Sequence, residues 1–270
     1  MELNQPGRKA EAFPSGRGPS SIRMLVLVLA ISCFLTGSVA GASVTSFPIA
    51  DAFVATGPTN NLSNNNYGGG GALAVAAPGL TNGEFQSVLK FDLSGTRNSL
   101  DAQYGAGQWS VEGVSLQLSS SPHNNAIYND VAAGLFGVSL MQNNSWVEGT
   151  GNASNPANNG ITYNTLQSSF INPALDQPLG TFSFNGGTSG SNVYSLTLSS
   201  GLTADVLAGG VLSLRLYAAD DAVSYLFSSR SASGGLQPQL TITAVPEPAV
   251  PLLLAFAAGA IGLWRRRFAS

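Results

Sequence analysis

The stretch Gln86–Leu93 reads Q-S-V-L-K-F-D-L and decides the fold class. Successive side chains of an extended chain point to opposite faces, so Leu89, Phe91 and Leu93 share one face and Lys90 lies on the other. A strand with one apolar and one polar face belongs in a sheet that covers a core on one side only. That arrangement is typical of antiparallel sheets.

The same pattern continues on both sides of this stretch. In Val211–Tyr217 three leucines share one face, and the other face carries Ser213, Arg215 and Tyr217. Further short segments, separated by Asn, Gly and Ser, are expected strands: Phe47–Ala55, Ala72–Ala77, Val111–Leu118, Leu135–Met141, Thr181–Phe184, Tyr194–Leu198, Tyr225–Ser229 and Gln239–Ala244. Leu202–Leu207 is expected to form one helical turn. Many short strands with turn residues between them predict an all-β domain, an antiparallel sandwich of two sheets.

The first 42 residues have the pattern of an export signal. Arg17 and Arg23 precede an apolar run from Met24 to Leu35, and small residues follow, with Ala40 and Ala42 as expected cleavage positions. The single cysteine, Cys33, lies inside the apolar run. We therefore expect residues 1–42 to be a signal peptide with an N-terminal extension, read by the Sec export machinery. The mature chain would have no disulfide and would depend on its core alone.

The tail, residues 245–270, has three parts in order. The motif Val245-Pro246-Glu247-Pro248 comes first, then an apolar run over residues 249–264, then Arg265, Arg266 and Arg267. A helix rises about 1.5 Å per residue, so this run is barely long enough to cross a hydrocarbon core of about 30 Å. The arginines are expected to stay on the cytoplasmic side, which places the domain before Val245 outside.

This tail resembles the PEP-CTERM sorting signal of Gram-negative bacteria. The resemblance implies that an exosortase-type sorting protease reads the tail and that the protein passes from the inner membrane to the cell surface or extracellular matrix. The alternative is an ordinary tail anchor, which has the same orientation but stays in the mature protein.

Charge separates the domain from its flanks. Residues 43–244 contain four basic and eleven acidic residues, a net charge of −7, whereas both flanks are basic. An acidic domain is repelled by nucleic acid and by anionic lipid.

Within residues 43–244 an ordered set of motifs resembles the DNRLRE-type domain. The motifs are D-A-F-V at 51–54, N-N-N-Y-G at 64–68, S-V-L-K-F-D-L-S at 87–94, W-V-E-G-T-G at 146–151, F-S-S-R at 227–230 and Q-P-Q-L at 237–240. The resemblance implies a jelly-roll-like sandwich, found on bacterial surface proteins and beside polysaccharide-degrading enzymes, of which some members bind acidic polysaccharide such as alginate. The chain departs from the family at Gln237, where a basic residue is usual.

Polar and aromatic residues give two candidate ligand sites. Sugar rings stack on aromatic side chains, and the candidates for glycan binding are Tyr67, Lys90, Trp109, Arg215, Tyr217 and Tyr225. The alternative for each ring is packing in the core, which we favour for Trp146. A structural calcium ion, which prefers six to eight oxygen ligands, is expected to use Asp51, Asn60 and Asn61. The alternative there is a turn-rich loop.

Catalysis has little support in the sequence. The single histidine, His123, lies in a polar segment, and no G-x-S-x-G motif is present. Three hypotheses remain: a non-enzymatic surface or matrix protein that displays a carbohydrate-binding-like sandwich, which we favour; a purely structural matrix component; and a polysaccharide hydrolase. Sequons at Asn61, Asn143 and Asn152 would allow the structural component to be glycosylated.

Overall fold

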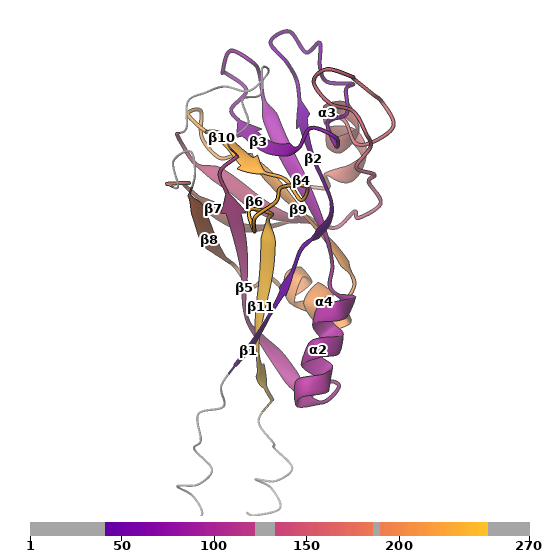
Figure 1. Ribbon diagram of the computed structural model, residues 1–270, viewed down its shortest axis with the longest axis vertical. Helices are drawn as coiled ribbons and strands as arrows, with labels where there is room; N and C mark the ends of the chain where they lie inside the picture. Colours follow the sequence, from indigo (N-terminus) through magenta and orange to yellow (C-terminus); the bar gives the residue numbers. More distant parts are fainter. Residues whose placement is uncertain (1–40, 122–132, 186–189, 248–270) are drawn as a thin grey trace, which may run out of the picture. The chain divides into compact units, whose positions relative to one another are not determined.

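The computed structural model describes residues 41–121, 133–185 and 190–247, and two antiparallel sheets form most of this part (Figure 1). One sheet has four strands in the order β1-β11-β5-β8, and the other has the order β10-β3-β4-β9-β6-β7 with β2 paired to β4. The strands are β1 Ala42–Ser46, β2 Pro48–Ala55, β3 Ala72–Ala76, β4 Phe85–Asp92, β5 Trp109–Ser119, β6 Phe136–Met141, β7 Gln177–Phe182, β8 Ser191–Leu196, β9 Val211–Ala218, β10 Ser224–Ser228 and β11 Gln239–Pro246. The expected two-sheet sandwich is confirmed.

The main core lies between the two sheets. Leu89 and Phe91 of β4 and the alternating leucines of β9 enter it from the seven-stranded sheet. Leu116 and Ile242 enter it from the four-stranded sheet. Aromatic rings fill one part of this core, where Phe136 lies within 6.0 Å of four other rings, measured between ring centroids. The pattern that the sequence shows in Gln86–Leu93 and Val211–Tyr217 therefore builds the interior.

The outer face of the seven-stranded sheet is covered by the segment that follows β6. Trp146, Ile161 and Leu166 pack there on Val88 and Met141 to form a second, smaller cluster. The segment includes α3 (Tyr163–Thr165) and η1 (Leu166–Phe170), which begin at a capping box between Thr162 and Thr165. The sequence pattern predicted no helix there. Both faces of this sheet are thus partly buried.

Two longer helices pack at the end of the sandwich beside β1 (Figure 1). Helix α4 (Ser200–Ala208) includes the expected turn Leu202–Leu207 and ends at Gly209 in the left-handed conformation. Helix α2 (Ser94–Tyr104) was not expected, because only Thr96 and Leu100 of its eleven residues are buried and no apolar stripe marks it.

The structure corrects several expected boundaries. Strand β1 was missed, and β7 begins four residues before the expected Thr181. Strand β11 does not end at Ala244 but continues through Val245 and Pro246, which pair with Ser110 and Trp109. Among the described residues β1 pairs with β11 only as far as Ala244, so Pro246 has a neighbouring strand on one side only and its missing N–H breaks no bond to β1. The first half of the tail motif is therefore part of the sandwich.

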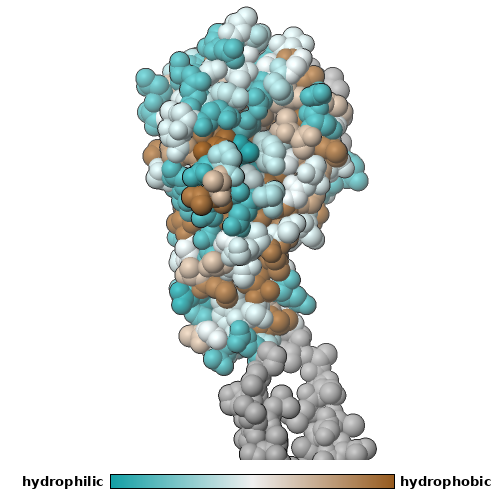
Figure 2. Space-filling view, turned by 180° about the vertical axis from the view of Figure 1, so that it is seen from behind, coloured by the Kyte–Doolittle hydropathy of each residue, from teal (hydrophilic) through white to brown (hydrophobic). Residues whose placement is uncertain are grey.

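The remaining tail and signal residues lie outside the described part. They comprise Ala40 and the rest of the expected signal peptide up to it, Pro248, the apolar run 249–264 and Arg265–Arg267. His123 lies outside it as well. Among the residues that the structure describes, none belongs to a helix long and apolar enough to span a membrane. Seen from behind, hydrophobic residues form small separate areas among hydrophilic ones (Figure 2).

Replacing Phe136 by alanine should destabilise the fold strongly. Phe136 is fully buried among aromatic rings, and such truncations cost about 3–5 kcal/mol because they leave a cavity. Its neighbour Leu135 is 42% exposed, so Leu135→Ala should change stability by less than about 1 kcal/mol. Urea unfolding of both variants measures the difference. Equal losses would contradict the placement of Phe136 at the centre of the core.

Candidate functional site

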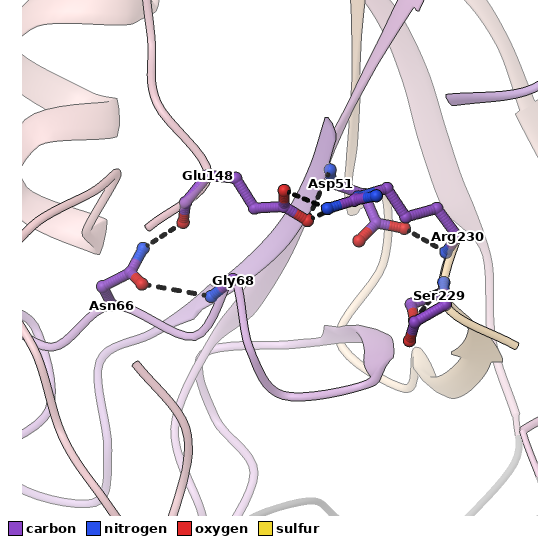
Figure 3. Close-up of polar contacts among 7 residues, drawn as sticks. Asp51, Asn66, Gly68, Glu148, Ser229 and Arg230 are labelled. Carbon is purple, nitrogen blue, oxygen red and sulfur yellow. Dashed lines mark hydrogen bonds and ion pairs between the residues drawn. The ribbon is translucent and has the colours of Figure 1, made fainter. Parts of the chain in front are cut away.

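Three segments far apart in the sequence meet at a partly buried ionic network (Figure 3). The guanidinium of Arg230 donates to both carboxylate oxygens of Glu148, over 2.8 Å from Nε and 2.7 Å from Nη2. The backbone N–H of Arg230 donates to Asp51 Oδ2 over 2.6 Å, and the backbone N–H of Asp51 donates to Glu148 Oε1 over 3.2 Å. The network thus joins β2, the segment after β6 and the segment after β10.

Asn66 extends this network with four side-chain hydrogen bonds. Its fully buried amide donates to the carbonyl oxygens of Glu148 and Ile161 and accepts from the backbone N–H groups of Gly68 and Gly151. The chains approach so closely that a Cβ atom on Gly68 would clash with the carbonyl oxygen of Glu148. Only glycine fits at this position, which explains in structural terms why the motif N-N-N-Y-G ends in Gly68.

Burial raises the pKa of Asp51 to about 7. The neighbouring Glu148 carboxylate also raises it, while the backbone N–H and the guanidinium of Arg230 lower it. The network is therefore a place where protonation affects folding. Its main role is to fasten the segment after β6 onto the sheet, because Asp51 and Asn66 expose almost no surface to a ligand.

Three of the expected glycan-binding rings belong to the interior. Tyr67, Trp109 and Tyr225 are each at most 3% exposed. Tyr67 stacks on Phe53 with 4.6 Å between ring centroids, Trp109 donates to Asp101, and Tyr225 donates to the carbonyl of Gly134. These rings present no free face to a sugar, so the structure removes them from the candidate set.

Lys90 has a structural contact in place of an exposed charge. Its Nζ donates to the carbonyl oxygen of Trp146 over 2.5 Å and lies 4.4 Å from the centroid of that residue's indole ring. Trp146 is 1% exposed and donates from Nε1 to Ser213 Oγ over 2.9 Å. Lys90 therefore holds the covering segment, and Trp146 packs in the second cluster as the sequence favoured.

The other two candidates, Arg215 and Tyr217, lie together on the outer face of the seven-stranded sheet. The Arg215 guanidinium carbon lies 4.4 Å from the Tyr217 ring centroid, and both side chains are partly exposed. The Tyr217 ring lies across Gly137 of the neighbouring strand β6, where a Cβ atom would clash with the ring. A cation and an aromatic ring are thus fixed side by side next to solvent.

Polar atoms without a hydrogen-bond partner gather around this pair. Arg215 Nε, Ser139 Oγ and Gln86 Oε1 are buried atoms for which the described residues supply no partner. Ser139 is the direct cross-strand neighbour of Arg215, and Gln86 lies on the adjacent strand β4, two residues from Val88, the neighbour of Arg215 on the other side. An unpartnered buried polar group costs about 1–3 kcal/mol, so three on one face form an unusual set. We call Gln86, Ser139, Arg215 and Tyr217 the outer-face site.

One acidic and one phenolic side chain, those of Glu84 and Tyr163, lie at the edge of the outer-face site. Glu84 accepts hydrogen bonds from Tyr163 Oη over 2.6 Å and from Gln86 Nε2 over 2.5 Å. Sequence reasoning missed Gln86, Ser139, Glu84 and Tyr163. Ser139 is the one polar side chain in the apolar strand F-G-V-S-L-M, which was a usable signal, but nothing local marks Tyr163, which a distant segment brings in.

A hollow opens in the covering segment itself. Its volume is about 570 Å³, and it is lined by residues 142–145, 168–173 and 175, none of which is charged. Asn144 Nδ2 donates to the carbonyl of Val211 over 2.7 Å, while Asn144 Oδ1 is buried without a partner among the described residues. Asp176 borders this hollow through hydrogen bonds from the backbone N–H groups of Gln142 and Asn172.

The residues expected to bind calcium differ in their surroundings: one is buried and hydrogen-bonded, and two are exposed. The Asp51 carboxylate is engaged by Arg230, whereas Asn60 and Asn61 lie in the exposed turn after β2. Within the described ranges no three His, Cys, Asp or Glu side chains stand close enough to hold a metal ion. Calcium binding stays a prediction, and chelation followed by a melting measurement tests it.

Comparison with known proteins gives no assignment. No protein-family model matches the chain, and no curated protein matches it. The function of the chain is therefore inferred from its own residues and their geometry.

Replacing Asp51 by asparagine should change how stability depends on pH. The carboxyl keeps its proton up to about pH 7 in the folded protein but loses it near pH 3.8 when unfolded, so Asp51 makes the fold less stable as pH rises between these values. The free energy of unfolding of the wild type, relative to Asp51→Asn, should fall by on the order of 4 kcal/mol from pH 4 to pH 7. Asp221→Asn, at an exposed position, controls for the loss of one carboxyl group. A relative stability that rises with pH would mean that Arg230 holds Asp51 ionised.

Proposed function

We propose that the chain is an exported, non-enzymatic cell-surface or matrix protein whose sandwich binds a glycan at the outer-face site. One observation carries this proposal: the Arg215 guanidinium and the Tyr217 ring lie side by side, both partly exposed, on the outer face of the seven-stranded sheet. A sugar supplies hydroxyl groups that both donate and accept, and its ring face stacks on an aromatic side chain.

The export and sorting part of the proposal rests on the two ends of the sequence. The resemblance of residues 245–270 to a PEP-CTERM signal supports recognition by an exosortase-type protease after Sec export. The DNRLRE-like motifs support the glycan-binding role through the jelly-roll-like sandwich they imply. A purely structural matrix role is the outcome if no glycan is bound.

An outer-face ring and a buried serine of the same strand provide a matched test of glycan binding. Tyr217→Ala removes the partly exposed ring on which a sugar would stack, so it should weaken glycan binding about tenfold or more. Ser213→Ala removes the acceptor of Trp146 Nε1, so it should lower the melting temperature and leave binding unchanged. Binding of the purified protein to a panel of neutral and acidic polysaccharides, with calcium and with chelator, measures affinity.

Normal glycan binding by Tyr217→Ala would contradict the proposal.

Changing Arg265, Arg266 and Arg267 to serine should disturb sorting. Without the basic cluster the expected helix loses its orientation signal, so less protein should reach the surface. Surface labelling of cells that produce each form gives the measurement. Unchanged surface display would argue against a tail read as a sorting signal.

A further inference from the structure

We propose that the sorting protease binds the tail motif by strand exchange, in which Val245, Pro246 and Glu247 leave β5 and pair with the protease. We call these three residues the β11 end. The inference rests on the proposed function, because it takes the tail to be a sorting signal, and it adds the step that makes the signal accessible. It is based on how the β11 end is paired and on where β11 loses a neighbouring strand.

The β11 end is bound to β5 through its main chain. Val245 and Pro246 pair with residues 110 and 109, and the N–H of Glu247 donates to the carbonyl oxygen of Gln108 over 2.9 Å. Main-chain groups alternate in direction along an antiparallel strand, so Val245 directs its N–H toward β5 as Glu247 does. Pro246 occupies the alternate position, which faces the other edge, and it has no N–H.

This other edge is poorly suited to binding a second protein. Proteins that recognise an extended segment commonly add it as a strand to a sheet of their own, through main-chain hydrogen bonds. The free edge of the β11 end has proline at its centre and offers no donor there, and proline on an edge strand discourages such pairing. The donors of Val245 and Glu247 point to β5 instead. A protease that binds the main chain of this segment must therefore take the place of β5.

Strand β11 has a point of separation at Ala244. The register with β5 shifts between Thr243 and Ala244, and the pairing with β1 reaches only Ala244. Beyond this residue the described part of the chain supplies a paired strand on one side alone. Tyr104 of α2 donates from Oη to the carbonyl oxygen of Ala244 over 3.3 Å and holds this position. The β11 end can therefore open as a small unit while the rest of the strand stays in the sheet.

Opening of the β11 end leaves the neighbouring contacts of the core in place. Trp109, which pairs with Pro246, is 3% exposed and donates from Nε1 to Asp101 Oδ1 of α2 over 2.8 Å. This hydrogen bond does not involve β11. Val245 and Pro246 are only partly buried, so their removal from the sheet exposes little apolar surface.

Two engineered disulfides test the proposal. Ser110→Cys with Val245→Cys joins two directly paired residues beyond the register shift. Ser115→Cys with Thr241→Cys joins two directly paired residues before it and is the matched control. Such residues lie about 4.5–5.5 Å apart between Cα atoms, within the range that a disulfide spans. The natural cysteine, Cys33, lies in the expected signal peptide, and thiol titration checks that each bridge has formed.

The bridge beyond the register shift should slow removal of the tail at least tenfold, because it holds the β11 end on β5. The intact mass of the protein, followed over time in producing cells, measures removal. A reducing agent should restore it, and the control bridge should leave it at the wild-type rate.

The other outcomes separate this inference from the proposed function. Removal at the wild-type rate with either bridge would overturn strand exchange and leave the sorting proposal standing. A block by both bridges would contradict separation at Ala244. A tail that the wild type keeps would withdraw the sorting proposal together with this inference.

Amide hydrogen exchange tests the opening without the protease. In the purified protein the N–H of Glu247 should exchange at least tenfold faster than those of residues 240–243, which are paired on both sides. The oxidised variant Ser110→Cys with Val245→Cys should exchange more slowly at Glu247 than the wild type. Equal protection of Glu247 and residues 240–243 in the wild type would contradict an end that opens by itself.

Discussion

Glu148 holds three distant segments of the chain together, and the covered face of the larger sheet depends on it. Its carboxylate takes both donors of the Arg230 guanidinium and the N–H of Asp51, while its carbonyl accepts from Asn66. Arg230 is exposed, but removal of the Glu148 carboxylate would leave the N–H of buried Asp51 without its acceptor, which costs more than an exposed ion pair contributes. Because this contact fastens the segment after β6, it also positions Tyr163 and Asp176 at the edge of the outer-face site.

The sequence was sufficient for the parts of the fold that depend on alternation. Strands β4 and β9 alternate cleanly because one face meets the main core, so their positions could be read directly. Helix α2 could not be read, since it buries only two side chains and its sequence has no apolar stripe. The continuation of β11 through Val245 and Pro246 was missed because the prolines of the tail motif were expected to end the strand before Val245, whereas pairing runs on to the first of them.

The candidate site was predicted only in part, for a physical reason. Exposed and buried aromatic residues look alike in a sequence, and only packing separates Tyr217 from Tyr67, Trp109 and Tyr225. Arg215 and Tyr217 could be paired because they are two residues apart on one strand. Their partners Gln86 and Ser139 come from neighbouring strands, and sheet order, which alternation does not determine, brings them together.

The pairing of β11 between β1 and β5 has a mechanical consequence. Residues 239–246 form eight registered pairs with β5, and five residues of the same strand pair with β1 on the other edge. A force applied to the chain beyond Glu247 therefore acts along the axis of β11. All these pairs bear the force together and do not separate one by one. A sandwich anchored through β11 and loaded through its other sheet would carry the tension across the pairing of β11 with β1 and β5.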